Sequence, residues 1–184
     1  VCGYQMAHSD SAYVGVGTFP GSSNIEYLQA RLLDTLMAGK TYCVEYYVSS
    51  GNRSQYSTIP TQAYFSDYPI SGQFGDPIIL TPHIIDATII TDTVNWVLIH
   101  GDYTAHGGEQ FITLGHFIDL ASTTFLNTDP FGLPHAYFYI DDIKIYQKAS
   151  AEAGLTSTIC ATDSIHIGNQ PDDGVTYAWQ PTNG

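Results

Sequence analysis

Positive charge is the scarcest feature of this 184-residue chain. The sequence has 5 Lys and Arg against 18 Asp and Glu, which gives a formal net charge of −13. A surface of this sign repels nucleic-acid phosphates and anionic lipids, and no run of basic residues offsets the repulsion. The composition therefore excludes nucleic acid as a partner and leaves cations, neutral polymers such as glycans, and other proteins.

Long apolar runs and cysteine motifs are missing as well. No apolar stretch approaches the roughly 20 residues that span a bilayer, and the first residues do not form a signal peptide. We therefore expect the sequence to be part of a longer protein. Cys2, Cys43 and Cys160 lack the C-x-x-C spacing of zinc or redox sites. An odd number of cysteines in a secreted chain indicates a free thiol or a partner outside the sequence.

Helical periodicity is almost absent, and alternation with a period of two residues takes its place. From Tyr42 to Val48, large apolar residues alternate with Cys43, Glu45 and Tyr47. Clusters of Gly, Ser, Asn, Asp and Pro separate this run from several similar ones. Many short strands with turn signals between them predict an all-β protein, folded as a two-sheet sandwich through about Tyr146.

Residues 95–100, Asn-Trp-Val-Leu-Ile-His, are apolar on both faces of the predicted strand. Strands of this type are typical of the centre of a sheet that is covered on two sides. Together with the alternating runs, this segment predicts a core made of Val14, Leu28, Leu32, Val44, Tyr46, Val48, Trp96, Leu98, Ile112, Leu114, Ile143 and Ile145.

A change in composition divides the chain. Residues 148–155 are mostly small or polar and read as a linker. After them, a strand carrying Cys160 precedes a strand carrying Trp179, an order that resembles the opening of immunoglobulin-like and PKD repeats. We therefore expect 156–184 to be the beginning of an Ig/PKD-like domain, because about 30 residues are too few to bury their own core.

Several ordered motifs in residues 1–147 resemble one family. The chain is similar to the carbohydrate-binding-like (galactose-binding-like) jelly-roll modules of large surface proteins of gliding Bacteroidetes, which are exported by type IX secretion. The motifs that carry this resemblance are Gly3-Tyr4-Gln5, Ala12-Tyr13-Val14-Gly15, Ala38-Gly39-Lys40-Thr41-Tyr42, Gly107-Gly108-Glu109 and Tyr139-Ile140-Asp141-Asp142-Ile143.

The resemblance implies a jelly-roll β-sandwich that lies outside the cell or on its surface. In such modules another strand usually precedes the point where this sequence begins, so one sheet edge is expected to lack its usual partner. The Ig-like resemblance implies that Cys160 pairs with a cysteine outside this chain. Cys2 and Cys43 are then the possible internal pair.

Asp141 and Asp142 are adjacent carboxylates in a strand, where Asp is disfavoured. Their side chains are expected on opposite faces, so one of them needs water or a cation. The resemblance implies a structural calcium ion held by Asp141 together with a Glu of the strand that usually precedes this sequence, with Asp142 or Glu109 as further candidate ligands, because calcium takes several oxygen ligands. The alternatives are a solvated Asp pair and a structural Glu109 that follows a glycine turn.

Aromatic residues are abundant, with 14 Tyr, 8 Phe and 2 Trp. Glycan sites combine exposed rings, against which sugar C–H groups pack, with polar groups that bind hydroxyls. For each ring the alternative is packing in a strand or the core. The candidate ligand-binding residues are Arg53, Tyr56, Tyr64, Tyr68, Asn95, Trp96, Tyr103 and Tyr137.

Motifs for catalysis are lacking. No Gly-x-Ser-x-Gly elbow is present, and nothing in the sequence singles out a pair of carboxylates for glycoside hydrolysis. We therefore expect a non-catalytic binding or adhesion module that recognises neutral glycans or a surface polymer and works with other modules of its parent protein. The alternative is a structural spacer, or a subunit of an extracellular filament or stalk assembled through β-strand contacts.

Overall fold

The computed structural model describes residues 3–19, 25–72, 77–149 and 176. Contacts between Cα atoms divide the chain into two units, Val1–Gln147 and Lys148–Gly184. The expected linker beyond residue 149 and the strands expected around Cys160 and Trp179 lie outside the described residues. Within the described part, no helix is long and apolar enough to cross a membrane.

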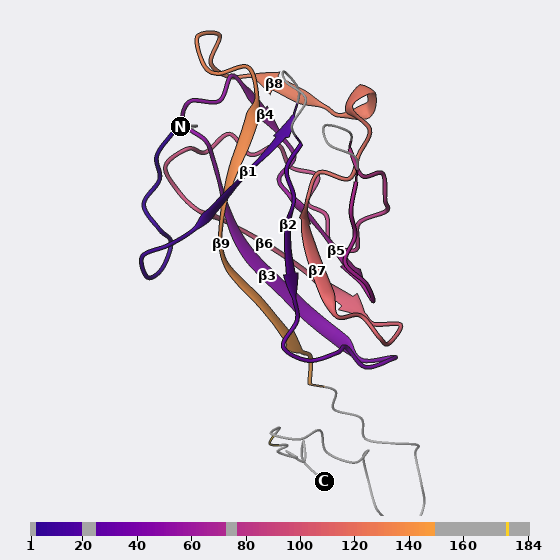
Figure 1. Ribbon diagram of the computed structural model, residues 1–184. Helices are drawn as coiled ribbons and strands as arrows, with labels where there is room; N and C mark the ends of the chain where they lie inside the picture. Colours follow the sequence, from indigo (N-terminus) through magenta and orange to yellow (C-terminus); the bar gives the residue numbers. More distant parts are fainter. Residues whose placement is uncertain (1–2, 20–24, 73–76, 150–175, 177–184) are drawn as a thin grey trace, which may run out of the picture. The chain divides into compact units, whose positions relative to one another are not determined.

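The first unit is an all-β sandwich, which confirms the predicted fold class (Figure 1). One sheet has the order β1-β9-β3-β6, a second has the order β2-β7-β5, and β4 pairs with β8. All of these strands are antiparallel, and the chain alternates between the two larger sheets as a jelly roll does. The elements are β1 (Val14–Phe19), β2 (Leu28–Arg31), β3 (Thr41–Ser50), β4 (Tyr56–Thr58), β5 (Gln62–Ser66), β6 (Val97–Thr104), β7 (Phe111–Gly115), the 3₁₀ helix η1 (Leu120–Ser122), β8 (Phe125–Asn127) and β9 (Ala136–Gln147).

The core lies between the two larger sheets. Along β3 the predicted alternation is confirmed, since Val44, Tyr46 and Val48 are fully buried while the residues between them are partly exposed. Ile112 and Leu114 of β7 meet them from the second sheet. Burial of each such side chain contributes about 1.5–3 kcal/mol to folding, so the inward rows of β3 and β7 hold the sheets together.

The prediction for residues 95–100 was wrong, because β6 is an edge strand. Ile99 is buried, but Leu98 on the opposite face is 39% exposed. Trp96 is only partly buried, and segment 3–13 contacts it. Ile143 was also expected in the core and is 37% exposed.

The remaining core predictions agree with the structure in large part. Several of the expected residues pack against the buried cluster while keeping some exposure, as residues near the open sides of a sandwich do. They are Val14, Leu28, Leu32 and Ile145.

Residues 83–90 close one open side of the sandwich, between the edges β5 and β6. The backbones of Ala63 and Ile84 exchange hydrogen bonds of 3.0 and 3.1 Å, which continues the second sheet past β5. Ile84 and Ile90 are buried in the core. Ile84 also packs closely over β6, because its Cδ1 lies 3.1 Å from where a Cβ of Gly101 would be. This plug brings His83 to the rim of the sandwich.

Candidate functional site

An open cleft lies at this rim, with a volume of about 490 Å³. Three of the predicted ligand-binding residues, Tyr64, Tyr68 and Tyr103, line it together with His83 and Glu109. They come together because β5 and β6 are the edges of two facing sheets on the same side of the sandwich. We call this the rim cleft.

Stacked rings form the wall of the rim cleft. The His83 ring lies 4.7 Å from the Tyr64 ring at an interplanar angle of 13°, and 4.5 Å from the Tyr103 ring. Tyr103 in turn stacks on Phe65 at 4.7 Å. Offset stacks of this kind hold ring orientation beyond what area burial alone gives. The wall is therefore preformed and partly apolar.

The protonation of His83 follows from its contacts. The backbone N–H of Phe65 donates to Nδ1 of His83 at 3.0 Å, so the neutral ring carries its proton on Nε2. Burial lowers the pKa of His83, as does the nearby His106, while Glu109 acts in the opposite direction. The ring is therefore neutral at pH 7, and Nε2–H is its hydrogen-bond donor.

Glu109 lies at the base of the rim cleft and is only 3% exposed. Its carboxylate accepts hydrogen bonds from the Tyr103 hydroxyl at 2.6 Å and from the backbone N–H groups of His106 and Gly107 at 2.7 and 2.9 Å. Burial alone would raise the pKa of Glu109, but these hydrogen bonds outweigh it and hold the pKa below its usual value. Glu109 therefore stays charged and fixes both the Tyr103 hydroxyl and the adjoining turn.

The glycines before Glu109 are required by the same turn. Gly107 and Gly108 have φ values of +96° and +106°, where other residues are strained. A Cβ on Gly107 would also lie 2.8 Å from the Cβ of Ala38. The Gly-Gly-Glu motif thus has a structural role at the cleft.

The outer part of the rim cleft is exposed and polar. Tyr68 is 79% exposed, and the carboxylate of Asp67 beside it faces Gly108, with oxygens about 3.5 Å from where a Cβ of that glycine would be. Among the residues that line the cleft there is no Lys or Arg. Rings together with carboxylate, imidazole and hydroxyl groups suit a ligand rich in hydroxyls and disfavour an anion.

The other predicted ligand-binding residues lie elsewhere. The Tyr56 ring packs on Phe125 at 5.3 Å, and Tyr137 contacts Tyr139 at 5.6 Å. Asn95 donates to the Asp92 carboxylate at 2.9 Å. Arg53 is exposed near the β4–β8 end, where its carbonyl accepts from the backbone of Leu133, and Trp96 lies under the N-terminal segment.

Two residues of the rim cleft, Asp67 and His83, were not among the ligand-binding residues predicted from the sequence. Asp67 directly precedes the predicted Tyr68 and follows a strand, a position where an exposed polar side chain is common. The sequence position of Asp67 could therefore have identified it as a candidate. His83 lies in a stretch without periodicity, and only the folded chain brings it against β5.

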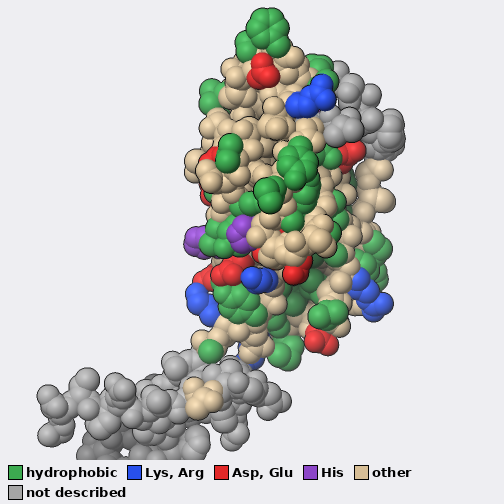
Figure 2. Space-filling view, turned by 90° about the vertical axis from the view of Figure 1, so that its left-hand side faces the viewer, with side chains coloured by type: hydrophobic (Ala, Val, Ile, Leu, Met, Phe, Trp, Pro, Cys, Tyr) green, Lys and Arg blue, Asp and Glu red, His purple; other side chains and the backbone are tan. Residues whose placement is uncertain are grey.

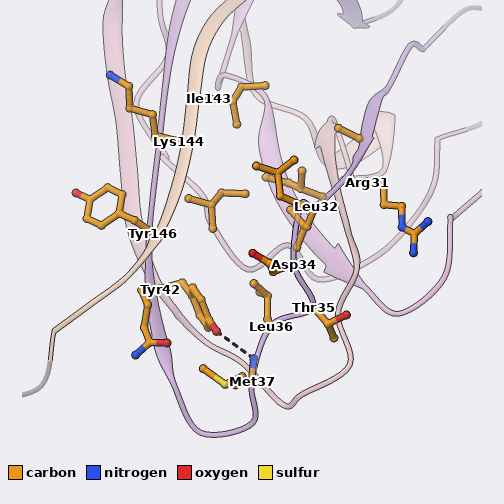
Figure 3. Close-up of a pocket in the computed structure, with 15 residues that line it drawn as sticks. Arg31, Leu32, Asp34, Thr35, Leu36, Met37, Tyr42, Ile143, Lys144 and Tyr146 are labelled. Atoms are coloured by element: carbon orange, nitrogen blue, oxygen red, sulfur yellow. Dashed lines mark hydrogen bonds between the residues drawn. The ribbon is translucent and has the colours of Figure 1, made fainter. Parts of the chain in front are cut away.

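A second, larger cavity lies on the opposite open side of the sandwich, with a volume of about 970 Å³ (Figure 3). β1 pairs with β9 only as far as Ile140, so among the described strands β3 is the single neighbour of the last part of β9. That free edge and the edge strand β2 flank the cavity, which we call the edge groove. Its lining is mainly apolar and includes Leu33, Leu36, Met37, Tyr42, Ile112, Ile143, Ile145 and Tyr146.

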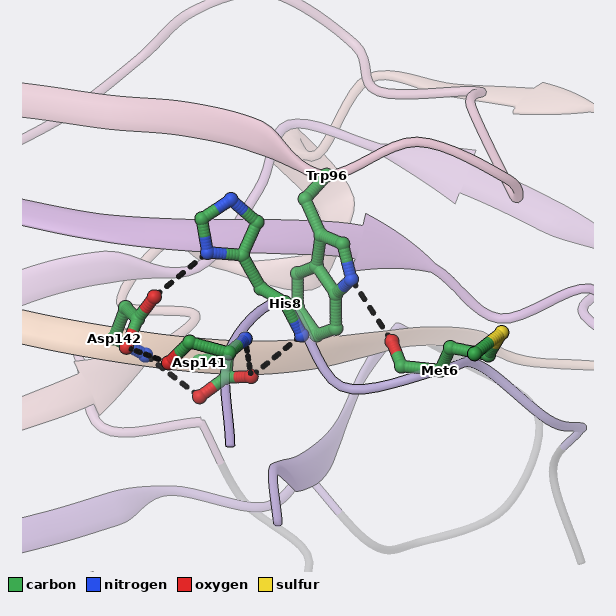
Figure 4. A network of polar contacts seen from close by, with 6 residues as sticks. Met6, His8, Trp96, Asp141 and Asp142 are labelled. Atoms are coloured by element: carbon green, nitrogen blue, oxygen red, sulfur yellow. Dashed lines mark hydrogen bonds and ion pairs between the residues drawn. The ribbon is translucent and has the colours of Figure 1, made fainter. Parts of the chain in front are cut away.

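The Asp pair holds the N-terminal segment against β9 (Figure 4). Asp141 accepts a hydrogen bond from the backbone N–H of His8 at 2.8 Å. Asp142 binds the Nδ1 atom of His8 and the hydroxyl of Ser9, both at 2.6 Å. The His8 ring stacks on Tyr47 at 3.7 Å. We call these contacts the N-terminal clasp.

The expectation that the two Asp side chains face opposite ways was wrong. Asp142 has a φ of +50°, and the register between β3 and β9 shifts next to it. A β-bulge of this kind adds a residue to one strand and redirects the side chains around it. Both carboxylates consequently reach the same residue, His8.

The calcium expectation stays a prediction. The clasp supplies two carboxylates, Asp141 and Asp142, which is fewer oxygen ligands than calcium takes. Glu109 is engaged in the rim cleft. In the described part of the chain, no group of three or more His, Cys, Asp or Glu is placed to hold a metal ion. The residues present therefore do not by themselves make a calcium site.

The cysteine predictions also remain open. Cys43 is partly exposed, and its thiol forms no disulfide with a described residue. Its possible partner Cys2, like Cys160, lies outside the described residues.

No family model and no curated protein matches the chain. The chain is similar to the CBM22-1 xylan-binding domain of Xyn10C from Paenibacillus barcinonensis, with 14% identity, a TM-score of 0.48, and coverage of 77% of this chain and 76% of that one. Similarity at this level leaves the chemistry of the rim cleft as the guide to function.

Proposed function

We propose that the jelly-roll unit is a non-catalytic module that binds neutral glycans in the rim cleft. The observation that supports this most directly is the exposed Tyr68 ring, next to Asp67, in the lining of a cleft that also contains the stacked rings of Tyr64, His83 and Tyr103. Sugars present apolar C–H faces and polar hydroxyls at once, so they need this combination of groups. The absence of Lys and Arg from the lining makes neutral sugars the better partner than acidic ones.

Each group has a distinct part in this proposal. The Tyr68 ring packs against a sugar face, the Asp67 carboxylate accepts hydrogen bonds from hydroxyls, and Nε2–H of His83 donates one. Glu109 does not touch the sugar but holds the Tyr103 hydroxyl and the 106–108 turn in place. A preformed site of this kind loses little conformational entropy on binding.

The chemistry of Glu109 supports binding rather than hydrolysis. A glycosidase needs one carboxyl group with a raised pKa as the general acid. Glu109 has the opposite character, because its pKa is lowered and its oxygens already accept three hydrogen bonds. Asp67 is then the other carboxylate in the lining and would have no acid partner.

The setting belongs to the same proposal. The acidic, tyrosine-rich composition and the motif resemblance support an extracellular module on a cell-surface protein, where it would act in adhesion with other modules of its parent. A shallow sugar site gives weak binding, on the order of micromolar to millimolar Kd. Repetition of modules would supply avidity.

A glycan array probed with a multivalent form of the full chain tests the proposal, followed by calorimetry on each hit. We expect neutral oligosaccharides to bind and Asp67→Asn to weaken binding by about 10-fold or more, since a hydrogen bond to a charged group contributes about 1.5–3 kcal/mol. Tyr68→Ala should weaken it similarly. Tyr4→Ala is the matched control, because Tyr4 is 68% exposed and lies outside the rim cleft.

Two results would count against the proposal. One is silence across the array with a correctly folded chain. The other is binding that Tyr68→Ala and Tyr4→Ala change equally, which would place the sugar outside the rim cleft.

A further inference from the structure

The edge groove is an unusual surface for a chain with so few cations. Leu33 on its rim is fully exposed, Met37 is 54% exposed and Tyr146 is 49% exposed. Apolar residues this exposed and this close together mark interaction sites more often than chance positions do. Two strand edges flank them, so a polypeptide would find both apolar surface and free backbone groups here.

An apolar side chain, Phe131, projects from the other end of the same unit. Phe131 is 98% exposed at the tip of a turn between β8 and β9. The turn is well defined, because the backbone N–H of Gly132 donates to the Asp129 carbonyl at 2.9 Å and that of Phe131 donates to the Asp129 carboxylate at 3.0 Å. The space-filling view shows an apolar side chain projecting at one end of the domain, above an acidic one (Figure 2). We call residues 129–132 the Phe131 turn.

The charges of the two surfaces are complementary. Arg31 and Lys144, two of the five cations in the chain, line the edge groove together with Asp34. The Phe131 turn carries Asp129, and Arg53 lies beside it, where its carbonyl accepts from Leu133. Asp129 of the turn can therefore pair with Arg31 or Lys144 of the groove. Arg53 beside the turn can pair with Asp34 of the groove.

We propose that the chain associates head to tail, with the Phe131 turn of one copy inserted in the edge groove of the next. Figure 1 places the turn between β8 and β9 at the end of the unit opposite to the ends of β2 and β9 that flank the groove. A contact between two different surfaces leaves a free turn and a free groove on every assembly that has not closed into a ring, and surfaces at opposite ends of the unit favour linear chains of copies. Such association does not depend on glycan binding, because the rim cleft shares no residue with either surface.

Sedimentation equilibrium of the full chain, from about 10 µM to about 1 mM, tests the proposal over the range expected for a weak contact. We expect the average mass to rise with concentration for the wild-type chain. Phe131→Ser and Leu33→Ser should each shift this rise to concentrations about tenfold higher or more, since each removes one buried apolar side chain from the contact. Both residues are fully exposed in the single copy, so both variants should fold normally. Val94→Ser, at a residue 74% exposed outside both surfaces, should leave the rise unchanged.

Mixing the two variants makes the test specific to a head-to-tail contact. Phe131→Ser retains an intact groove and Leu33→Ser retains an intact turn, so an equimolar mixture should form a 1:1 dimer that grows no further. A wild-type chain that stays monomeric throughout would overturn the proposal. So would association that both variants leave intact, or a mixture that behaves as the sum of its parts. Association abolished by Leu33→Ser but not by Phe131→Ser would mean that the groove holds a different segment and would also overturn it.

Discussion

At the residue scale, Glu109 and His116 show two outcomes of burial for an ionisable side chain. Glu109 accepts three hydrogen bonds and remains charged. His116 is fully buried, and its Nδ1 atom has no partner among the described residues, while Nε2 contacts the Thr123 hydroxyl at 2.7 Å. Burial lowers the pKa of His116 to about 4, so it stays neutral in the folded chain. The difference lies in hydrogen bonding and not in depth.

The lowered pKa of His116 predicts a loss of stability in mild acid. Between pH 6.5 and about 4 the unfolded chain binds a proton at His116 that the folded chain does not. The free energy of unfolding should therefore fall as the pH drops through this window, by roughly 3 kcal/mol in total from this residue. Urea titrations at a series of pH values measure it. The His116→Gln variant should show a flatter dependence from pH 6.5 to 4, and identical slopes for the two chains would contradict the assignment.

At the scale of elements, the N-terminal clasp depends on the bulge in β9. Asp142 has a φ of +50°, which Asn tolerates well and Ala does not. Asp142→Asn also keeps an oxygen that can accept from Ser9. We therefore expect Asp142→Ala to lower the thermal midpoint clearly more than Asp142→Asn, and to increase amide exchange in residues 4–9. Equal effects of the two substitutions would mean that backbone conformation contributes little to the clasp.

The elements that the sequence predicts well are those whose two faces differ. β3 alternates because one face meets the core and the other meets solvent, and its pattern is readable from Tyr42 to Val48. The prediction that β6 lies at the centre of a sheet was wrong. Trp96 contacts the N-terminal segment, which explains an apolar residue there without a second covering layer over the strand. The prediction that Asp141 and Asp142 face opposite ways was wrong because the sequence of a strand does not indicate the bulge at Asp142.

At the scale of the whole molecule, the candidate site is a product of topology. Tyr64, Tyr68 and Tyr103 were predicted one by one as exposed aromatics, an expectation that was wrong for Tyr103, which is 6% exposed. Their meeting depends on β5 and β6 being edges on the same open side. The plug at 83–90 completes the cleft and carries no periodic signal. The remaining candidate residues are of the same aromatic and polar types, but the sheet order places them away from the rim cleft.

Net charge also acts on the whole molecule. With 18 acids against 5 bases, like charges repel one another more strongly in the compact state than in the unfolded chain. Salt screens this repulsion, so the thermal midpoint should rise between about 10 and 200 mM NaCl, where the Debye length falls from about 30 to below 10 Å. A gain of about 1 kcal/mol would raise the midpoint by about 2–4 °C. A midpoint that falls over this range would show that specific ion pairs outweigh the repulsion.

The same titration, repeated with MgCl₂ and CaCl₂ at equal ionic strength, separates screening from the calcium site predicted at Asp141. Both divalent ions screen alike, whereas a bound ion stabilises the folded state by mass action. Because no group of three or more ligands in the described part of the chain is placed to hold a metal ion, we expect coincident curves for the two salts in this chain. The calcium prediction applies to a module that includes the preceding strand implied by the family resemblance, where calcium should give an increment over magnesium that saturates with concentration. Asp141→Asn should remove that increment, because the amide keeps an oxygen that can accept from His8 but loses the charge that attracts the ion. Coincident curves for the two salts in that longer module would contradict the calcium site.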